Sequence, residues 1–579
     1  MLALLAGCVS LPEAGPVRTR AVEDPGEQGQ GLFDFAPEGP RTGASRIDIV
    51  NGFLQAMRRS PQSTATAREF LTDESSSRWV PERGTLVYGS QVLTETRAAV
   101  TAELEEPVAL DGRGAWLGEV GDGQGVRYRL RLIKEDGEWR ISAPPDLLMI
   151  PRSHFETRYE QFFLYFFDRT AQILVPEPVY LPTGEQAPTL LVRRLLRGPD
   201  PEEPGVTRTF LPPGTELELS VPVGRDGTAE IPLSDDIRQL GNQDLQMALA
   251  QLAWTLRQVP GVETMRVTVD GAPLDIPGER GGESVQAWTE FDPSIHWASQ
   301  ELFGIRAGRV VALSADGNRQ VESHFGSSDH GFRSIAVDFP AEQVAGVAAD
   351  GRSVVVVPRS GRPAEESGAP PEEATTVYSS GKDLLRPAWD LYGQIWLVDR
   401  DRGRARLVVL RSGVPFEVTA RGISGRDVTS FTVSRDGTRL VAVVDDERGD
   451  RLLVARVVRR DDGRVRAVTL ARDLPLGPVN PAEIRDVAWV TPGSLVVLTG
   501  PATGTSQVRV VPVDGSSLPA QSTDAEILRE RSTRVVASPS PGSPLYLAVS
   551  RGQVYELASD GQWVGPRLDG PLLSPAFVG

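Results

Sequence analysis

Ser334-Ile335-Ala336-Val337-Asp338 is a short apolar segment whose recurrence decides the fold of residues 281–579. Each copy begins a unit with the same order: a short apolar strand, a turn, a stronger apolar strand and two edge-like strands. The other copies are residues 386–390, 429–433, 486–490, 534–538 and 574–578, with centres roughly 40 to 57 residues apart. Repetition of a four-stranded unit at this period predicts a β-propeller.

The last copy, residues 574–578, has no further strands after it. Conversely, two predicted strands at 308–313 and 319–322 lack a leading strand of their own. Pairing these segments closes a ring and removes the exposed edges of an open sheet. Six blades fit the repeats best, with five or seven as the alternatives.

Asp-Gly pairs recur between the predicted strands of this region. As calcium ligands they would need the ligand spacing of an EF-hand, which the sequence lacks. We prefer the interpretation that they form two-residue hairpin turns, because Asp-Gly supplies the positive φ angles of such turns. The pairs are Asp316-Gly317, Asp350-Gly351, Asp436-Gly437, Asp462-Gly463, Asp514-Gly515 and Asp560-Gly561.

At the other end of the sequence, Leu5-Ala6-Gly7-Cys8 ends a short apolar run, and Cys8 is the only cysteine. A small residue before a lone cysteine resembles the lipobox of bacterial lipoproteins. The resemblance implies an S-diacylglycerol group and an N-acyl chain (palmitate, for example) on Cys8, with removal of the preceding residues. The alternative is that Cys8 is a chance residue. The positively charged start of a signal peptide is missing, so residues 1–7 are interpreted as the remnant of a longer one.

Residues 8–44 are rich in proline, glycine and charge, which predicts a flexible stalk behind the lipid anchor. The sequence contains no apolar run of about 18 residues, the length that a membrane-spanning helix needs. Attachment to the membrane therefore depends on Cys8, and stable anchoring takes more than one acyl chain.

The overall composition narrows the classes of partner. The net charge is −17, and a nucleic-acid-binding protein would instead show a basic face. Lys134 and Lys382 are the only lysines among 61 basic residues, so arginine supplies nearly all positive charge. A single cysteine excludes an intramolecular disulfide and a thiolate metal cage.

Residues 45–150 show an α+β pattern. Ser45 is placed to cap a helix whose apolar residues follow helical spacing, and Asp136-Gly137 predicts a hairpin turn. The predicted strands cover 85–88, 115–118, 126–132 and 139–141. This arrangement resembles the cone-shaped fold of the nuclear-transport-factor type.

Residues 151–280 predict a second small α+β domain. Pro188 opens a helix, an apolar face between Leu245 and Val259 marks a longer one, and a strand follows at 264–271. The order resembles the GerMN domain, an extracytoplasmic module whose known members supply no catalytic residues. The resemblance is carried by Leu195-Leu196-Arg197-Gly198-Pro199, Phe210-Leu211-Pro212-Pro213-Gly214-Thr215, Ala229-Glu230-Ile231-Pro232-Leu233-Ser234 and Val267-Thr268-Val269-Asp270-Gly271.

Motifs of catalysis are not found in the sequence. Ser379-Ser380-Gly381-Lys382 fits the Ser-x-x-Lys pattern of penicillin-recognising enzymes, but its companion motifs are missing, so we interpret it as a surface loop. His324 and His330, with Asp329 between them, lack a third histidine nearby for a metal site. Trp389, Trp396 and Trp489 fall on predicted strands and are interpreted as blade core. We therefore predict no catalytic residue, no cofactor and no metal site.

The combined order of lipobox, stalk, two small α+β domains and propeller resembles the LpqB family of actinobacterial lipoproteins over essentially the whole chain. That family is associated with the MtrA–MtrB two-component system. The resemblance implies a non-enzymatic protein, lipid-anchored on the extracytoplasmic face of the cell membrane. Its partner would be the extracytoplasmic domain of a sensor histidine kinase, and its role the tuning of signalling in cell-envelope and division control.

Two alternatives stay open. The first is a propeller that binds or hydrolyses cell-wall glycans, which predicts clustered acids or aromatic residues at the central mouth. The second is a passive scaffold between envelope proteins.

Overall fold

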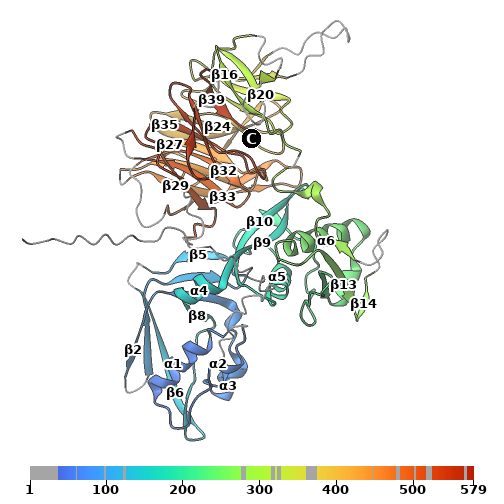
Figure 1. Cartoon of the computed structure of the whole chain (residues 1–579), viewed down its shortest axis with the longest axis vertical. Coiled ribbons are helices and arrows are strands. Elements are labelled where there is room, and N and C mark those ends of the chain that lie inside the picture. The colour runs from blue at the N-terminus through green and yellow to red at the C-terminus, as the bar shows by residue number, and fades with distance from the viewer. Residues whose placement is uncertain are drawn as a thin grey trace, which may run out of the picture.

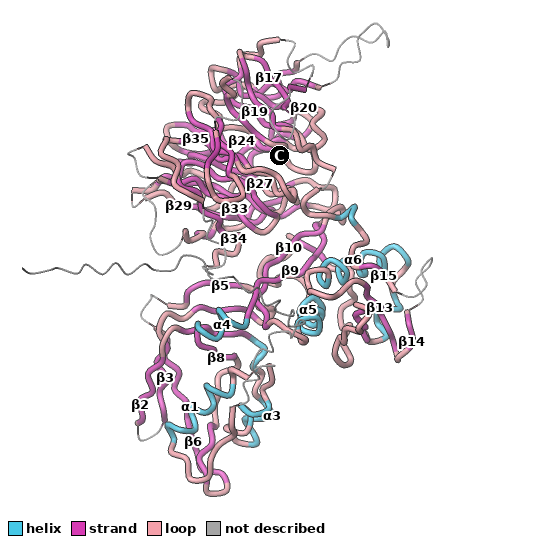
Figure 2. Tube along the Cα trace, viewed as in Figure 1, coloured by secondary structure: helices cyan, strands magenta, loops and turns pink. Residues whose placement is uncertain are grey.

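The computed structural model describes residues 37–59, 62–96, 99–121, 125–274, 282–295, 297–313, 320–321, 328–359, 374–447, 449–476, 483–500, 504–516, 525–565 and 570–579. Several predicted features lie outside these residues: the lipobox Leu5, Ala6, Gly7 and Cys8, most of the predicted stalk, His324 and Asp316-Gly317. Figure 1 shows an elongated molecule with the propeller at one end and the N-terminal α+β region at the other. Helices concentrate outside the propeller, as Figure 2 shows.

The N-terminal region combines helix α1 (Arg46–Ala56) with two four-stranded sheets. Ser45 caps α1 as predicted, because its side chain accepts from the Asp48 N–H while the Asp48 carboxylate accepts from the Ser45 N–H. Asp136 and Gly137 both have positive φ (52° and 85°), which confirms the predicted two-residue turn.

The first sheet has the order β2 (Gln91–Glu95), β3 (Ala99–Leu104), β6 (Val126–Glu135) and β7 (Glu138–Ile141). The second has the order β5 (Trp116–Glu119), β4 (Val108–Asp111), β1 (Gly84–Tyr88) and β8 (Leu148–Pro151). The short helices are α2 (Ala65–Arg68), α3 (Asp73–Arg78), η1 (Pro81–Arg83) and α4 (Arg152–Arg158). The α+β class is as predicted, while the likeness to the nuclear-transport-factor cone stays a prediction.

The middle region packs two helices against strands from both of its small sheets. Helices α5 (Ala187–Leu196) and α6 (Asn242–Leu256) contact each other, and α6 also lies against strand β9 (Tyr159–Asp168). Pro188 stands in the first turn of α5, where its missing N–H costs no hydrogen bond, and Gly198 follows the helix with φ 81°. One sheet holds β10 (Leu174–Pro182), β9 (Tyr159–Asp168) and β11 (Thr207–Arg208). The other holds β12 (Thr228–Pro232), β13 (Thr264–Val269), β14 (Ala272–Pro273) and β15 (Glu283–Ser284).

The propeller consists of six sheets within the described residues. Each sheet is given from its inner strand outward. The first sheet contains β39 (Leu573–Ala576), β16 (Leu302–Arg306), β17 (Arg309–Leu313) and β18 (Gln320–Val321). The second and third are β19 (Phe332–Val337), β20 (Gln343–Ala348), β21 (Val354–Pro358), β22 (Thr375–Tyr378), and β23 (Ala388–Trp389), β24 (Ile395–Asp401), β25 (Arg404–Arg411), β26 (Val414–Val418). The fourth is β27 (Asp427–Val433), β28 (Arg439–Asp445), β29 (Arg451–Arg459) and β30 (Val465–Val468), with β31 (Arg472–Asp473) also on β29. The fifth and sixth are β32 (Ile484–Thr491), β33 (Ser494–Thr499), β34 (Gln507–Pro512), and β35 (Ser532–Val536), β36 (Tyr546–Val549), β37 (Val554–Leu557), β38 (Trp563–Val564).

Ring closure follows from the pairing of β39 with β16, in which Phe303 faces Ala576. The predicted leading strands at 334, 386, 429, 486, 534 and 574 correspond to β19, β23, β27, β32, β35 and β39, which line the axis. Strand β16 itself was missed by the prediction, which began the first blade at 308. Six clusters of buried apolar side chains each join two neighbouring sheets, the last linking the sixth sheet back to the first. The six-bladed propeller is therefore confirmed.

The Asp-Gly turns of the propeller differ from the prediction in type. In the five described pairs only the glycine has positive φ, between 67° and 82°. Each aspartate Oδ1 instead accepts from the backbone N–H two residues on, at 2.8–3.1 Å. The carboxylate thus stabilises an Asx turn before a left-handed glycine, and the two-residue turn is wrong for these pairs.

Candidate functional site: a docked hairpin and a lateral groove

The β9–β10 hairpin joins the middle region to the propeller, and Figure 1 shows it between the two. At its centre the Glu177 carboxylate pairs with two propeller arginines, Arg456 (Nη1 at 3.2 Å) and Arg439 (Nη2 at 3.2 Å). Arg439 also donates to the Pro176 carbonyl at 2.7 Å. The guanidinium of Arg439 is 2% exposed, so this contact is desolvated and specific in geometry.

The electrostatics of this network are strongly coupled. Burial alone would raise the pKa of Glu177, but Arg456 and Arg439 together hold that pKa below its usual value. Burial, followed by the charge of Arg456, lowers the pKa of Arg439. Glu203, 3.2 Å from Arg456 Nε, and Asp436, 3.4 Å from Arg439 Nη1, add the balancing negative charge. The hairpin is therefore held by two cations and three anions.

A second buried contact lies at the tip of the same hairpin. The Tyr392 hydroxyl of the propeller donates to the Asp168 carboxylate at 2.7 Å, and Asp168 is 1% exposed. Burial and then the Asp168 charge raise the pKa of Tyr392 well above its usual value. The guanidinium of Arg459 stacks over the Tyr392 ring at 4.3 Å and pairs with Asp390 at 2.8 Å. Tyr392 is thus held by a hydrogen bond at its hydroxyl and by a cation over its ring.

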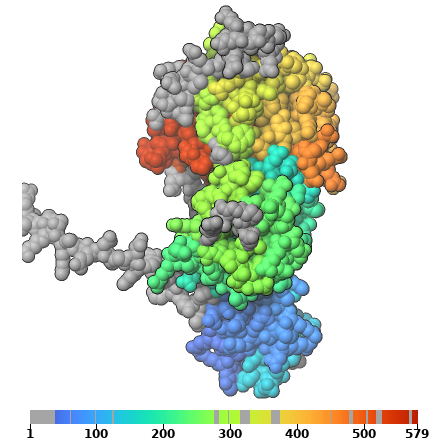
Figure 3. All heavy atoms as spheres, turned by 90° about the vertical axis from the view of Figure 1, so that its right-hand side faces the viewer, coloured from blue at the N-terminus to red at the C-terminus, as the bar shows by residue number. Residues whose placement is uncertain are grey.

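The opposite side of the middle region is attached to the N-terminal region. Arg113 pairs with Asp200 at 2.9 Å, and the Tyr180 N–H donates to the Gly114 carbonyl at 2.8 Å. Gly114 has φ 94°, and a Cβ at this position would lie 2.8 Å from the Tyr180 carbonyl oxygen. Figure 3 shows the middle region between the propeller above and the N-terminal region below. Polar contacts on both sides make the middle region the connector of the molecule.

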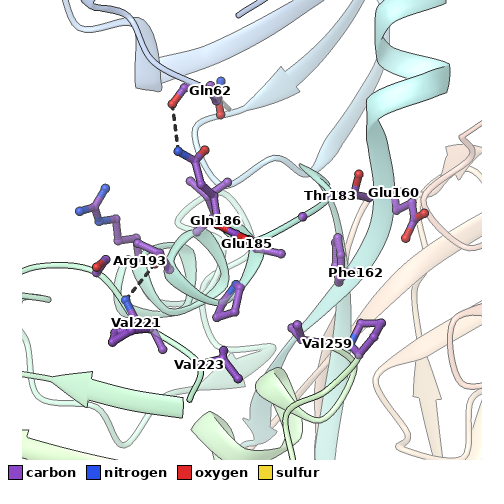
Figure 4. Close-up of a pocket in the computed structure, with 18 residues that line it drawn as sticks. Gln62, Glu160, Phe162, Thr183, Glu185, Gln186, Arg193, Val221, Val223 and Val259 are labelled. Atoms are coloured by element: carbon purple, nitrogen blue, oxygen red, sulfur yellow. Dashed lines mark hydrogen bonds between the residues drawn. The ribbon is translucent and has the colours of Figure 1, made fainter. Parts of the chain in front are cut away.

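A groove of about 960 Å³ opens on the middle region beside α5. Figure 4 shows Glu160 and Phe162 of β9 on one wall, with Arg193 of α5 and Gln186, the residue before that helix, across from them. The segment that precedes β12 forms the remaining wall and ends in Val223. Gln186 donates to the Gln62 carbonyl at 3.5 Å, so the N-terminal region borders the groove.

Apolar and charged residues both line the groove, and large apolar side chains are exposed on the segment of its third wall and just before it. Leu219 and Val223 are 72% and 39% exposed, which is unusual for large apolar side chains on one short segment. Arg193 donates to the Leu219 carbonyl at 3.0 Å and keeps its charge at the groove. Such a surface fits an extended protein segment with apolar side chains.

The residues singled out for chemistry lie apart in the structure. Ser379 and Lys382 are exposed in the loop between β22 and β23, as predicted. His330 stacks on the Phe332 ring at 5.3 Å, and its partner His324 lies outside the described residues. Within the described part of the chain, no group of three His, Cys, Asp or Glu side chains is placed to hold a metal ion. Trp389, Trp396 and Trp489 are at most 5% exposed and belong to the blade core, as predicted.

Sequence reasoning missed Glu177, Arg439 and Arg456. Glu177 lies in Pro176-Glu177-Pro178, between apolar residues of a predicted strand. A single carboxylate within an otherwise buried strand needs a partner, and this was the available signal. Nothing in the sequence identifies which arginines of the propeller supply that partner.

Comparisons with known proteins cover almost the whole chain. Residues 39–156 match the family model "Lipoprotein LpqB, N-terminal domain", residues 163–275 match "Sporulation and spore germination", and residues 308–576 match "Lipoprotein LpqB beta-propeller domain". The chain is 30% identical to "Lipoprotein LpqB" of Streptomyces avermitilis over 97% of this chain and 94% of that protein. It is 29% identical to "Lipoprotein LpqB" of Thermobifida fusca over 94% of this chain and 92% of that protein.

Among solved structures, the chain is similar to the first GerMN domain of the sporulation protein GerM from Bacillus subtilis. The match covers 22% of this chain and 92% of that domain, at 23% sequence identity and a TM-score of 0.18. A search of the described helices finds none that is both long and apolar enough to span a membrane.

Proposed function

Because the chain belongs to the LpqB family of lipoproteins, we propose that it is a lipid-anchored protein of the extracytoplasmic face that acts by binding and not by catalysis. The anchor is Cys8, carrying the S-diacylglycerol and N-acyl groups, with Leu5, Ala6 and Gly7 as its recognition sequence. Tethering to the membrane raises the effective concentration of the protein for a membrane partner.

The proposed partner is the extracytoplasmic domain of an MtrB-like sensor histidine kinase. The observation that carries this proposal is the lateral groove beside α5, with Val223 in its wall and the exposed Leu219 directly before the wall segment that begins at Ser220. The groove lies on the connector between the other two regions, so a bound segment contacts a fixed framework. Binding of the kinase there shifts the balance between its signalling states in proportion to the difference in affinity for those states.

The test of the binding surface uses two charge-introducing variants, Leu219→Glu and Val223→Glu, in the full chain. Both side chains are exposed, so folding is preserved and binding of the purified kinase domain is weakened at least tenfold. Val414→Glu on the outer strand β26 is the matched control, because Val414 is 66% exposed and lies on the propeller. Phosphotransfer by the kinase in intact cells should change with the two groove variants and not with the control.

Unchanged kinase binding by both groove variants would remove the groove from the proposal. Failure of the wild-type protein to bind the kinase domain, together with saturable binding of cell-wall glycan fragments, would replace the proposal by the glycan-binding alternative. Crosslinking from native membranes that yields several envelope proteins but no kinase would support the scaffold instead.

The test of the anchor uses Cys8→Ser in the chain with its native export signal. The wild-type protein should incorporate labelled palmitate and sediment with membranes, and the variant should do neither. Membrane association of the variant at the wild-type level would refute Cys8 as the anchor.

A further inference from the structure

Five inner strands of the propeller, together with the segment that leads into β23, each place one polar residue near the axis. The axial cavity is lined by one residue from each of five inner strands, namely Ala336, Thr432, Ala488, Val536 and Ala576, and by Arg386. Side chains two positions apart on a strand share a face, so the residue two before each of the five strand positions also points to the axis, and Arg386 stands two before Ala388, the first residue of β23. The resulting set, called the axial ring here, is Ser334, Arg386, Ser430, Asp486, Arg534 and Ser574.

Hydrogen bonds between neighbouring strands support this register. Ser430 Oγ donates to Asp486 Oδ1 at 2.6 Å, and the Val535 N–H donates to Asp486 Oδ2 at 3.1 Å. On the other side of the ring the Ile335 N–H donates to Ser574 Oγ at 3.1 Å. These bonds place Ser430, Asp486 and Ser574 against the neighbouring inner strands.

The backbone is irregular at this level in blade after blade. The pairing register shifts between Phe332 and Ser334, between Val428 and Ser430, between Ile484 and Asp486, and between Ser532 and Arg534. Ser574 itself has a positive φ of 47°. Bulges of this kind re-aim side chains and concentrate next to functional sites. Their repetition immediately before the axial ring indicates that the direction of these polar side chains matters.

The charges of the axial ring do not balance. It contains two guanidinium groups and one carboxylate, and both oxygens of that carboxylate already accept hydrogen bonds. Among the described residues, no hydrogen bond or ion pair is formed by the guanidinium of Arg386 or Arg534, although both are partly accessible to solvent. Burial and then the nearby Arg534 lower the pKa of Arg386 to about 10, against the opposing effect of the Asp486 charge.

Ser334 provides an independent sign of a missing ligand. Its side chain is 5% exposed, and its Oγ has no hydrogen-bond partner within the described structure. A buried hydroxyl without a partner costs free energy, and native structures rarely leave one unsatisfied. Because Ser334 belongs to the same ring as the two arginines, one bound group can satisfy all three.

The two mouths of the propeller differ in whether their arginines have hydrogen-bond partners. At the mouth that faces the middle region, Arg435 donates to the Ser294 carbonyl, to Ser540 Oγ at 2.8 Å and to Ser538 Oγ at 2.9 Å. Arg435 is 5% exposed and so closes this end with partners of its own. The axial ring lies toward the opposite mouth, at the beginning of the inner strands.

We propose that the axial ring is a binding site for a small oxyanion, a carboxylate or phosphate group held by Arg386, Arg534 and Ser334. Guanidinium groups bind both kinds of anion through paired hydrogen bonds, and the Ser334 hydroxyl donates a further one. The cavity below the ring measures about 50 Å³, so the site takes the anionic group alone, with the rest of a larger ligand outside the mouth. The ring contains no aromatic residue and a single acid, unlike the mouth that the glycan-binding alternative predicts.

The test is titration calorimetry of the full chain with inorganic phosphate and, separately, with succinate, at constant ionic strength. We expect saturable binding of at least one probe with one site per chain, and the preferred probe identifies the class of anion. Arg386→Gln and Arg534→Gln should each weaken binding at least tenfold. Arg404→Gln removes the same charge from an exposed position on β25 and should leave binding unchanged.

Thermal unfolding without ligand separates a binding role from a structural one. Since the two arginines repel each other, Arg386→Gln and Arg534→Gln should melt at or above the wild-type temperature, and added phosphate or succinate should raise the wild-type temperature only. Arg386→Lys keeps the charge and should retain part of the binding. Lower melting temperatures for both Gln variants, or no saturable binding of either probe to the wild-type chain, would overturn the proposal.

Discussion

The contact of Glu177 with Arg439 and Arg456 allows a quantitative test of how the middle region is held to the propeller. Glu177→Gln keeps the shape of the side chain but removes its charge, which leaves two guanidinium groups that are 2% and 9% exposed. Breaking a buried ion pair by removing one partner costs about 3–5 kcal/mol. Glu203 and Asp436 remain beside the arginines, so we expect about 3 kcal/mol, the lower end of that range.

The assay is calorimetric unfolding of the full chain together with limited proteolysis and small-angle scattering. We expect the transition of the middle region to separate from that of the propeller, faster cleavage between the two, and a larger radius of gyration. Combining Glu177→Gln with Arg456→Gln should cost less than the two single changes added together, because the charge left unpaired by the first is removed by the second.

The control is Glu103→Gln, which breaks the exposed Glu103–Arg127 pair, where Arg127 is 72% exposed. That change should cost less than about 1 kcal/mol and leave the domains together. An effect of Glu177→Gln no larger than this control, or single changes whose costs simply add, would refute the ion-pair network as the basis of docking.

The pH dependence of docking follows from the lowered pKa of Glu177. A carboxyl whose pKa is lower in the folded state stabilises that state above its unfolded pKa of about 4.3 and loses the contribution as the pH falls through the folded pKa. The separation of the two transitions should therefore appear in the wild-type chain only below about pH 4. In Glu177→Gln it should be present already at neutral pH.

Three further outcomes are expected. Burial and then Arg58 and Arg158 lower the pKa of His154 to about 4, so the folded state disfavours the protonated imidazole. The free energy of unfolding should therefore fall as the pH drops from about 6.5 to 4. His154→Asn should remove this effect, and histidine NMR titration measures the pKa directly. Phe303→Ala, at a fully buried position of β16, should lower the free energy of unfolding in denaturant by about 3–5 kcal/mol, and a loss below about 1 kcal/mol would contradict the closed ring. Gly437→Ala, at φ +67°, should cost more than about 1 kcal/mol in the same measurement, and an unchanged midpoint would contradict the left-handed turn.

The fold was predictable where one apolar pattern repeats. A short apolar segment, such as the ones that contain Ala336 and Ala488, begins each blade, and ring closure follows because a sheet edge is costly to leave open. Strand β16 was missed because Leu302–Arg306 has no leading segment before it: its inner partner, β39, comes from the far end of the chain. The Asp-Gly pairs were assigned the wrong turn because sequence alone does not distinguish an aspartate with positive φ from one that accepts a backbone hydrogen bond.

The candidate sites were less predictable than the fold. Glu177 could have been noticed as a lone charge in an apolar strand, but its partners Arg439 and Arg456 lie more than 260 positions away. The axial ring depends on which side of each inner strand faces the axis, and the bulges at residues such as 333 and 533 change that side locally. Polar residues at these positions look like ordinary strand ends until the six strands are placed around one axis.

The pairing of β39 with β16 also governs how the propeller is made. The first blade lacks its inner strand until the last residues of the chain arrive, so one edge of β16 has no partner strand until then. Contacts between residues so distant in sequence make folding slow, and an unpaired strand edge invites association with other chains during the delay. Loss of only a few residues from β39 should therefore trap a nearly complete protein as aggregate, whereas an insertion between blades leaves the closing step intact.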